Sequence, residues 1–99
     1  MNIPTLKPTR QGTLLLSGAL DLDSSPAVFR HSKTLLNSLP SPIRIDLSSV
    51  TRSDSSGVAL LIAWQRFARK TNKTIQFLNL PITMQEIIRV SELEKVLSL

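Results

Sequence analysis

The residues whose types and spacing could carry chemistry are Asp54, Ser55 and Ser56, in a chain of 99 residues. They stand directly before Gly57 and a run of helix-forming residues, so their side-chain oxygens can accept hydrogen bonds from the free N–H groups of a first helical turn. Two interpretations of Ser55 follow. It is an N-cap, worth about 1 kcal/mol, or it is a hydroxyl accessible to a partner or a kinase. A phosphate there would meet free N–H groups and the positive end of the helix dipole.

Side chains suited to catalysis or metal binding are sparse in this sequence. His31 is the single histidine and there is no cysteine, so neither a metal site nor thiolate chemistry is expected. No G-x-S-x-G turn surrounds Ser55, and Asp54 beside it is a weak activator without an imidazole between the two groups. The three glycines form no phosphate-binding loop. We therefore expect no catalytic residue, no metal and no cofactor.

A helix is expected to begin at this turn and to run to about Lys70 or Thr71, where Asn72 supplies a stop. One side of it carries a core stripe at helical spacing, formed by Gly57, Leu60, Leu61, Trp64, Phe67 and Ala68. The opposite side carries Ser55, Val58, Ala59, Ile62, Arg66 and Arg69. Because Val58 and Ile62 do not suit a solvent-facing side, this second stripe is either covered or a docking surface. Docking is favoured, since a short chain offers little to cover it.

The other segments alternate between strands and helices. Strands are expected around Thr5–Leu6, over 13–20, over 42–47 and over 74–78. Helices are expected from Pro26 to about Leu39 and from Pro81, with a last short helix or strand from Ser91. Strand–helix–strand units of this length imply crossover connections and parallel pairing. The predicted class is α/β, one domain over 1–99, with a small mixed sheet of four to five strands and about four helices packed mainly on one side.

The net charge of +5 indicates an anionic neighbour, which could be nucleic acid, a membrane surface or an acidic protein patch. The one basic cluster ends the central helix, where it also complements the helix dipole: Arg66, Arg69, Lys70 and Lys73. Three phenylalanines, one tryptophan and no tyrosine give no visible platform for stacking bases, so nucleic acid is the weakest of the three. The N-terminus lacks an apolar signal segment, and the longest apolar run is too short to span a bilayer. The absence of cysteine suits a cytoplasmic setting, which is expected here.

The segment 45–61 resembles the central motif of the STAS domain family. In that family, a strand ending in an Asp-Leu-Ser type sequence leads into Asp-Ser-Ser/Thr-Gly at the start of a helix. This chain has Asp46-Leu47-Ser48 and Asp54-Ser55-Ser56-Gly57 at those places, and the resemblance covers nearly the whole chain. In the anti-sigma factor antagonists of the family, the serine matching Ser55 is the phosphoacceptor, and Asp46 and Asp54 match the acidic positions around it.

A second set of residues is similar to the MlaB-type STAS subunits of Mla phospholipid transporters, chiefly the run Ala59–Trp64 and the Leu80-Pro81 junction. This resemblance implies a non-catalytic subunit that binds and supports the cytoplasmic ATPase of an ABC transporter maintaining outer-membrane lipid asymmetry. The domain would be cytoplasmic and held at the inner membrane through that partner. The position matching Ser55 lies in the ATPase interface there.

The partner-binding residues expected on this basis are Asp54, Ser55, Ser56, Val58, Ala59, Ile62, Arg66 and Arg69. Self-association of the isolated domain through the same stripe is a further expectation. Because the Asp-Ser-Ser-Gly stretch fits both subfamilies, an anti-sigma factor antagonist regulated by phosphorylation at Ser55 stays as the alternative.

Overall fold

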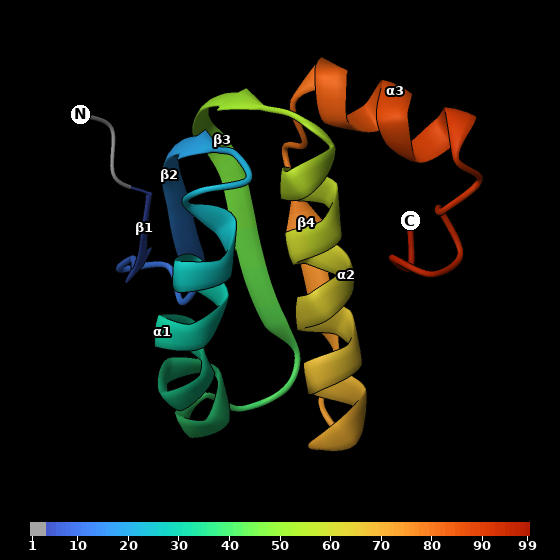
Figure 1. Ribbon diagram of the computed structural model, residues 1–99. Coiled ribbons are helices and arrows are strands. Elements are labelled where there is room, and N and C mark those ends of the chain that lie inside the picture. Colours follow the sequence, from blue (N-terminus) through green and yellow to red (C-terminus); the bar gives the residue numbers. More distant parts are fainter. Residues whose placement is uncertain (1–3) are drawn as a thin grey trace.

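Four strands form one mixed sheet in the computed structural model, which describes residues 4–99 (Figure 1). In spatial order they are β1 (Thr5–Pro8), β2 (Leu14–Leu20), β3 (Ile43–Ser53) and β4 (Ile75–Leu78). β1 pairs antiparallel with β2, whereas β2–β3 and β3–β4 pair in parallel. The two parallel pairs are each joined by a helix, as the strand–helix–strand spacing predicts. Residues 1–3, which the predicted domain over 1–99 includes, lie outside the described residues.

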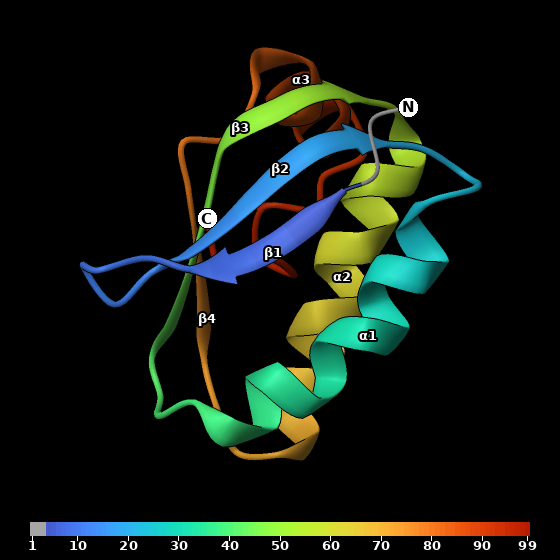
Figure 2. The ribbon, with the colours of Figure 1, turned by 90° about the vertical axis from the view of Figure 1, so that its left-hand side faces the viewer.

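The helices are α1 (Ser25–Ser38), α2 (Ser55–Lys70) and α3 (Ile82–Val90). α1 and α2 run in the same direction and cover one face of the sheet (Figure 2). Every second side chain along the first half of β3 and along β4 is buried, as expected for a sheet with one face covered by helices. These buried residues are Ile43, Ile45, Leu47, Ile75 and Phe77. On the other face, exposed Arg44 donates a hydrogen bond to Gln76 at 3.2 Å. The predicted α/β class with helices mainly on one side is confirmed.

The segment 91–99, predicted as a fourth helix or a strand, instead forms a series of turns. Glu92 and Ser98 adopt φ values of 57° and 59°. These are left-handed conformations, which interrupt right-handed helical hydrogen bonding. The chain therefore has three helices within the described residues, and its C-terminal segment folds back as an irregular strap.

The seam between α1 and α2 contains a buried polar link. Trp64 on α2 has 0% exposure, and its Nε1 donates to Ser32 Oγ on α1 at 2.8 Å. Ser32 Oγ in turn donates to the carbonyl oxygen of Phe29 at 2.8 Å. Every polar atom of this link has a partner, so α1 is fixed against α2 without leaving an unpaired group in the core.

Lys73 does not belong to the basic cluster in which the sequence placed it. Its Nζ donates to the carbonyl oxygens of Leu36, Asn37 and Leu39 at 2.9, 2.6 and 2.7 Å. These carbonyls lie at the end of α1, where a helix leaves C=O groups free and a positive charge is favourable. The ammonium group of Lys73 therefore stabilises the C-terminal end of α1 and is not free to bind a partner.

Candidate functional site

β3 continues to Ser53, well beyond the strand end predicted at Leu47. The polar residues after Leu47 remain in the sheet because β2 pairs with them, with Gly18 opposite Val50 and Leu20 opposite Ser53. The carboxyl ends of β2 and β3 thus lie side by side. The loops that follow the two strands meet at this edge of the sheet, which is where open α/β sheets generally place their binding sites.

The turn into α2 is capped by Asp54. Its Oδ1 accepts a hydrogen bond from the backbone N–H of Ser56 at 2.7 Å, and its own N–H donates to the carbonyl of Leu20 at 3.4 Å. The predicted helix start is confirmed, but the interpretation of Ser55 as the N-cap is wrong, because Asp54 holds that position. Ser55 is the first helical residue, it is exposed, and within residues 4–99 its hydroxyl makes no hydrogen bond.

Gly57 allows the first turn of α2 to sit directly on the ends of β2 and β3. A Cβ atom at this position would overlap Ser53 Oγ and would lie 3.2 Å from the Cβ of Leu20. The glycine therefore permits a close approach that a larger residue would allow only if Ser53 and Leu20 shifted. The first turn of α2, which follows Asp54, therefore lies directly against the ends of β2 and β3.

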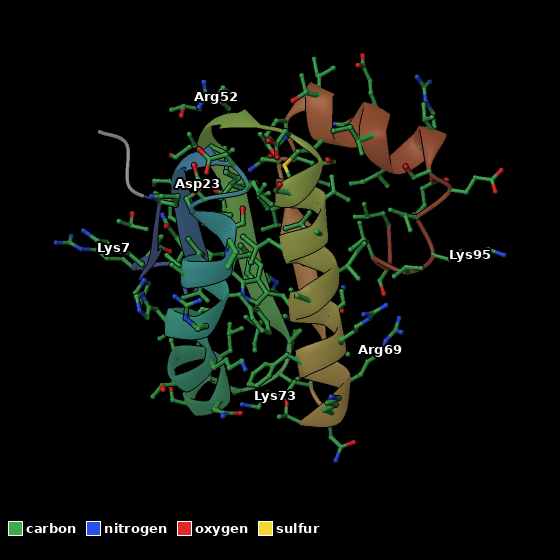
Figure 3. All side chains as sticks on the ribbon, in the orientation of Figure 1. Lys7, Asp23, Arg52, Arg69, Lys73 and Lys95 are labelled. Atoms are coloured by element: carbon green, nitrogen blue, oxygen red, sulfur yellow. The ribbon has the colours of Figure 1, made fainter. Side chains whose placement is uncertain are left out.

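The loop between β2 and α1 brings two more carboxylates to the same edge. Asp21 accepts hydrogen bonds from the backbone N–H groups of Ser24 at 2.8 Å and Asp23 at 3.0 Å. It also lies 3.9 Å from the guanidinium of Arg52. The hydrogen bonds from Ser24 are the main cause that lowers the pKa of Asp21. Figure 3 shows Asp23 and Arg52 at the end of the molecule where α2 begins.

These two carboxylates were missed in the sequence, although a signal was present. Asp21 and Asp23 lie just after the strand predicted over 13–20, and Asp54 lies between the strand predicted over 42–47 and the next helix. Once parallel pairing of these strands is inferred, their following loops must share an edge. Parallel pairing therefore predicts the fold class and also predicts that these loops lie together.

Asp46, expected as an acidic neighbour of Ser55, is far from it. In the pairing with β2 it lies opposite Leu15, whereas Ser53 lies opposite Leu20, so five residues of β2, or roughly 17 Å at strand rise, separate Asp46 from the end of β3. Its Oδ1 accepts hydrogen bonds from the backbone N–H of Ser48 at 2.9 Å and from Asn79 Nδ2 at 3.1 Å. That expectation is wrong, and Asp46 instead ties β3 to the end of β4.

The carboxyl of Asp46 predicts an acid-dependent loss of stability. The backbone hydrogen bond from Ser48 is the main cause that holds its pKa below the ordinary value of 3.8. A group with a lowered folded-state pKa stabilises above its unfolded-state pKa and loses that contribution as pH falls through the folded value. We expect Asp46→Asn to unfold at lower urea than the parent at pH 7, and the two midpoints to converge as the pH falls below the ordinary value of 3.8.

The matched control is Glu86→Gln, which changes an exposed carboxyl on α3 that makes no side-chain hydrogen bond within residues 4–99. Its urea midpoint should follow that of the parent at each pH. A constant difference between Asp46→Asn and the parent from pH 7 to pH 3 would contradict the assigned role of the Asp46 carboxylate.

Only part of the stripe predicted to face outward on α2 is exposed in the structure. Val58 is only 3% exposed and Ile62 packs, half-buried, against the core. α3 and the segment 91–99 flank this side of α2 (Figure 1). Gln65 Nε2 donates to the carbonyl of Leu97 at 3.1 Å, and Arg69 donates to the carbonyl of Val96 at 3.3 Å. The expectation that Val58 and Ile62 face outward on an uncovered surface is therefore wrong.

On the side next to α1, α2 borders a trough between the two helices. We call this trough the α1–α2 groove. Its apolar end has a volume of about 230 Å³ and is lined by Leu22, Ser25, Pro26, Phe29, Ser56, Ala59, Leu60 and Ala63. Its basic end has a volume of about 280 Å³ and is lined by Phe29, Lys33, Ala63, Arg66, Phe67 and Lys70. Phe29 and Ala63 border both ends, so the two hollows lie next to each other along the seam between α1 and α2.

The groove brings together part of the predicted partner-binding set. Ser56, Ala59 and Arg66 line it, and Asp54 and Ser55 stand at its apolar end. The walls contributed by α1 and its preceding loop were not predicted. Periodicity assigns a face to each helix, but it does not say which faces of two helices meet.

No group of three His, Cys, Asp or Glu side chains in residues 4–99 is placed to hold a metal ion. Over the same residues, no helix has the length and apolarity needed to cross a membrane.

The chain is a small α/β domain in which helices cover one face of the sheet. Its longest strand, β3, runs into the Asp-Ser-Ser-Gly turn, which Asp54 caps at one edge of the sheet. The family described as "Mlab, STAS domain" matches residues 6–98. The chain belongs to this MlaB-like STAS domain family, which confirms the resemblance in its sequence. Such domains are generally non-enzymatic regulatory and interaction modules. A search of curated proteins gives no match.

Proposed function

We propose that this domain is the STAS subunit that binds the cytoplasmic ATPase of an ABC transporter for phospholipids and supports its assembly or activity. The process served would be phospholipid trafficking that maintains outer-membrane lipid asymmetry. The observation that carries the proposal is the family match over residues 6–98, whose description is of the MlaB type. The domain would lie at the cytoplasmic face of the inner membrane through its partner, where a net charge of +5 suits an anionic leaflet.

The surface that we assign to the ATPase is the start of α2 with the loop before α1. Leu22 in that loop is 75% exposed, and exposed Ser55 begins the neighbouring helix. Asp23 and Asp54 supply charge around this apolar side chain. An exposed apolar residue within a polar rim is the usual composition of an interaction surface.

Replacement of Leu22 tests this surface. When the domain is co-expressed with the ATPase, we expect Leu22→Asp to reduce the co-purified ATPase at least about tenfold, because a central apolar anchor is worth about 2 kcal/mol or more. Val90→Asp is the matched control, since Val90 on α3 is 80% exposed and lies outside the proposed surface. Both variants should keep the parent's thermal midpoint. Equal recovery of the ATPase with Leu22→Asp and Val90→Asp would refute the assigned surface.

A second candidate, an anti-sigma factor antagonist switched by phosphorylation, is favoured by the free and exposed hydroxyl of Ser55. A phosphate there would add about −2 charge beside Asp54 and would weaken docking. Ser55→Ala, with Ser56→Ala as control, separates the candidates. Kinase-dependent release of an anti-sigma factor that Ser55→Ala abolishes supports the second candidate, whereas the ATPase proposal requires no turnover of a phosphate.

A further inference from the structure

We infer that the α1–α2 groove binds a short acidic segment of the partner protein, with one tyrosine side chain in the apolar end and carboxylates along the basic end. The inference rests on the proposed function in so far as it takes the partner to be a protein. It adds the chemistry of the bound segment and the order of its side chains along the groove.

The apolar end has the size of a socket for one side chain. Its volume of about 230 Å³ is below the range of about 300–1,000 Å³ that is usual for small-molecule sites. Its walls include Phe29, Ala59 and Ala63, which suit a ring. Aromatic side chains seated in such sockets are typical anchors of protein interfaces.

Ser25 selects a ring that carries a hydrogen-bonding group. It lines the apolar end and is 5% exposed, yet its Oγ has no hydrogen-bond partner within residues 4–99. The Oγ atom is closed off from solvent, so the side chain has to rotate about χ1 to meet an occupant of the groove. Because a buried hydroxyl without a partner is costly, an occupant that then supplies one gains affinity. Tyrosine combines an aromatic body with a hydroxyl that both donates and accepts.

The basic end carries positive charge that the fold leaves unpaired. Lys33 comes from α1, and Arg66 and Lys70 come from α2. Within residues 4–99 the one ion pair joins Arg52 to Asp21, so none of these three cations has a carboxylate partner. Lys33 Nζ lies 4.8 Å from the centre of the Phe29 ring, which holds it over the groove. Carboxylates of a bound segment would complement this end.

The two ends fix the length of the segment and the order of the tyrosine and the carboxylates along the groove. α1 and α2 are parallel, with the acidic loops of Asp23 and Asp54 at their N-terminal ends and the cations in their C-terminal halves (Figure 1). From Ala59 to Lys70 the helix rises about 16 Å, which about five extended residues span. The tyrosine must therefore stand about five residues from the last carboxylate, toward the acidic loops.

A membrane does not fit this trough as well as a peptide does. Anionic headgroups would satisfy Lys33, Arg66 and Lys70, but they would leave the apolar socket and Ser25 without an occupant. A flat bilayer surface also does not enter a groove between two helices. Binding to lipid is accordingly the competing outcome of the test.

The test is a ¹H–¹⁵N titration of the whole chain with a six-residue peptide that carries tyrosine at one end and three glutamates toward the other. We expect saturable shifts at Ser25, Ala59 and Ala63, with little change on α3. Peptides with alanine for tyrosine, or with glutamine for the glutamates, should bind at least about fivefold more weakly, because each exposed charge pair is worth up to a few-fold in affinity.

Charge reversal in the chain supplies the matched comparison. The triple variant K33E/R66E/K70E should lose the peptide-induced shifts, whereas R10E/R30E/R89E, which changes three exposed arginines elsewhere by the same net charge, should keep them. Well-dispersed spectra of both variants verify folding. Equal binding by the two variants, or no groove shifts with the parent, would overturn the inference.

Vesicles of phosphatidylglycerol distinguish the lipid alternative. If they shift the basic-end residues and K33E/R66E/K70E abolishes that effect while the peptide has none, the groove is a lipid contact and the inference is wrong. The peptide titration does not use the ATPase, so peptide binding without ATPase co-purification would refute only the proposed function. ATPase binding without peptide binding would refute only this inference.

Discussion

Trp64→Ala is expected to lower the free energy of unfolding by about 3–5 kcal/mol, the usual cost of truncating a fully buried tryptophan. Trp64 has 0% exposure and lies at the seam between α1 and α2. A domain of this size is stable by about 5–15 kcal/mol, so the loss removes much of the total. Because Trp64 is the single tryptophan, urea unfolding should be followed by far-ultraviolet circular dichroism.

Two further variants separate the packing of Trp64 from its hydrogen bond. Trp64→Phe keeps most of the volume and should cost clearly less than Trp64→Ala. Ser32→Ala keeps the indole but leaves its buried Nε1 unpaired, at a cost of about 1–3 kcal/mol. If Trp64→Ala unfolded within 1 kcal/mol of the parent, the assignment of this seam as the central core contact would be incorrect.

Gly57→Val is expected to destabilise the domain by about 3 kcal/mol or more, or to prevent folding. Even one Cβ at this position overlaps Ser53 Oγ and presses on Leu20, and overpacking by further methyl groups costs about 1–3 kcal/mol. Valine adds two methyl groups and restricts the side-chain rotamer in the first turn of α2. The measurement is the thermal midpoint, with soluble yield recorded for a variant that does not fold.

Alanine at the same position allows a finer test. Gly57→Ala gains up to about 1 kcal/mol in helix propensity, so a net loss of stability isolates the steric conflict. In a Ser53→Ala background the overlapping oxygen is absent, and Gly57→Ala should become less destabilising. Equal costs of Gly57→Ala in the two backgrounds would show that Leu20, rather than Ser53, is the limiting contact.

Much of the fold could be predicted because its signals are local. Alternation placed Ile43, Ile45 and Leu47 on the buried face of β3, and the Asp-Ser-Ser-Gly stretch marked the start of α2 to within a residue. The extension of β3 to Ser53 could not be read from its polar residues, because pairing with β2 holds them in the sheet. The turns after α3 depend on left-handed residues such as Glu92, which composition does not mark.

The candidate site was predicted in part, for a related reason. Asp54 and Ser55 were identified because the helix start is a local feature. Val58 and Ile62 were assigned outward because two apolar sides on one helix do not reveal that a later segment covers one of them. Asp46 was assigned by family position, and only the register of the strands shows how far from Ser55 it lies.

The side chain of Gln65 also determines how the domain should come apart. It is 4% exposed, and both protons of its amide are engaged, one by the carbonyl of Ile75 in β4 and one by that of Leu97. A single amide thus joins the central helix, an edge strand and the C-terminal strap. We therefore expect residues 91–99 to open together with α2 and β4, so that a hydrogen-bonded amide of this segment, such as that of Leu97, exchanges with solvent at the rate of that unit rather than that of a fraying end.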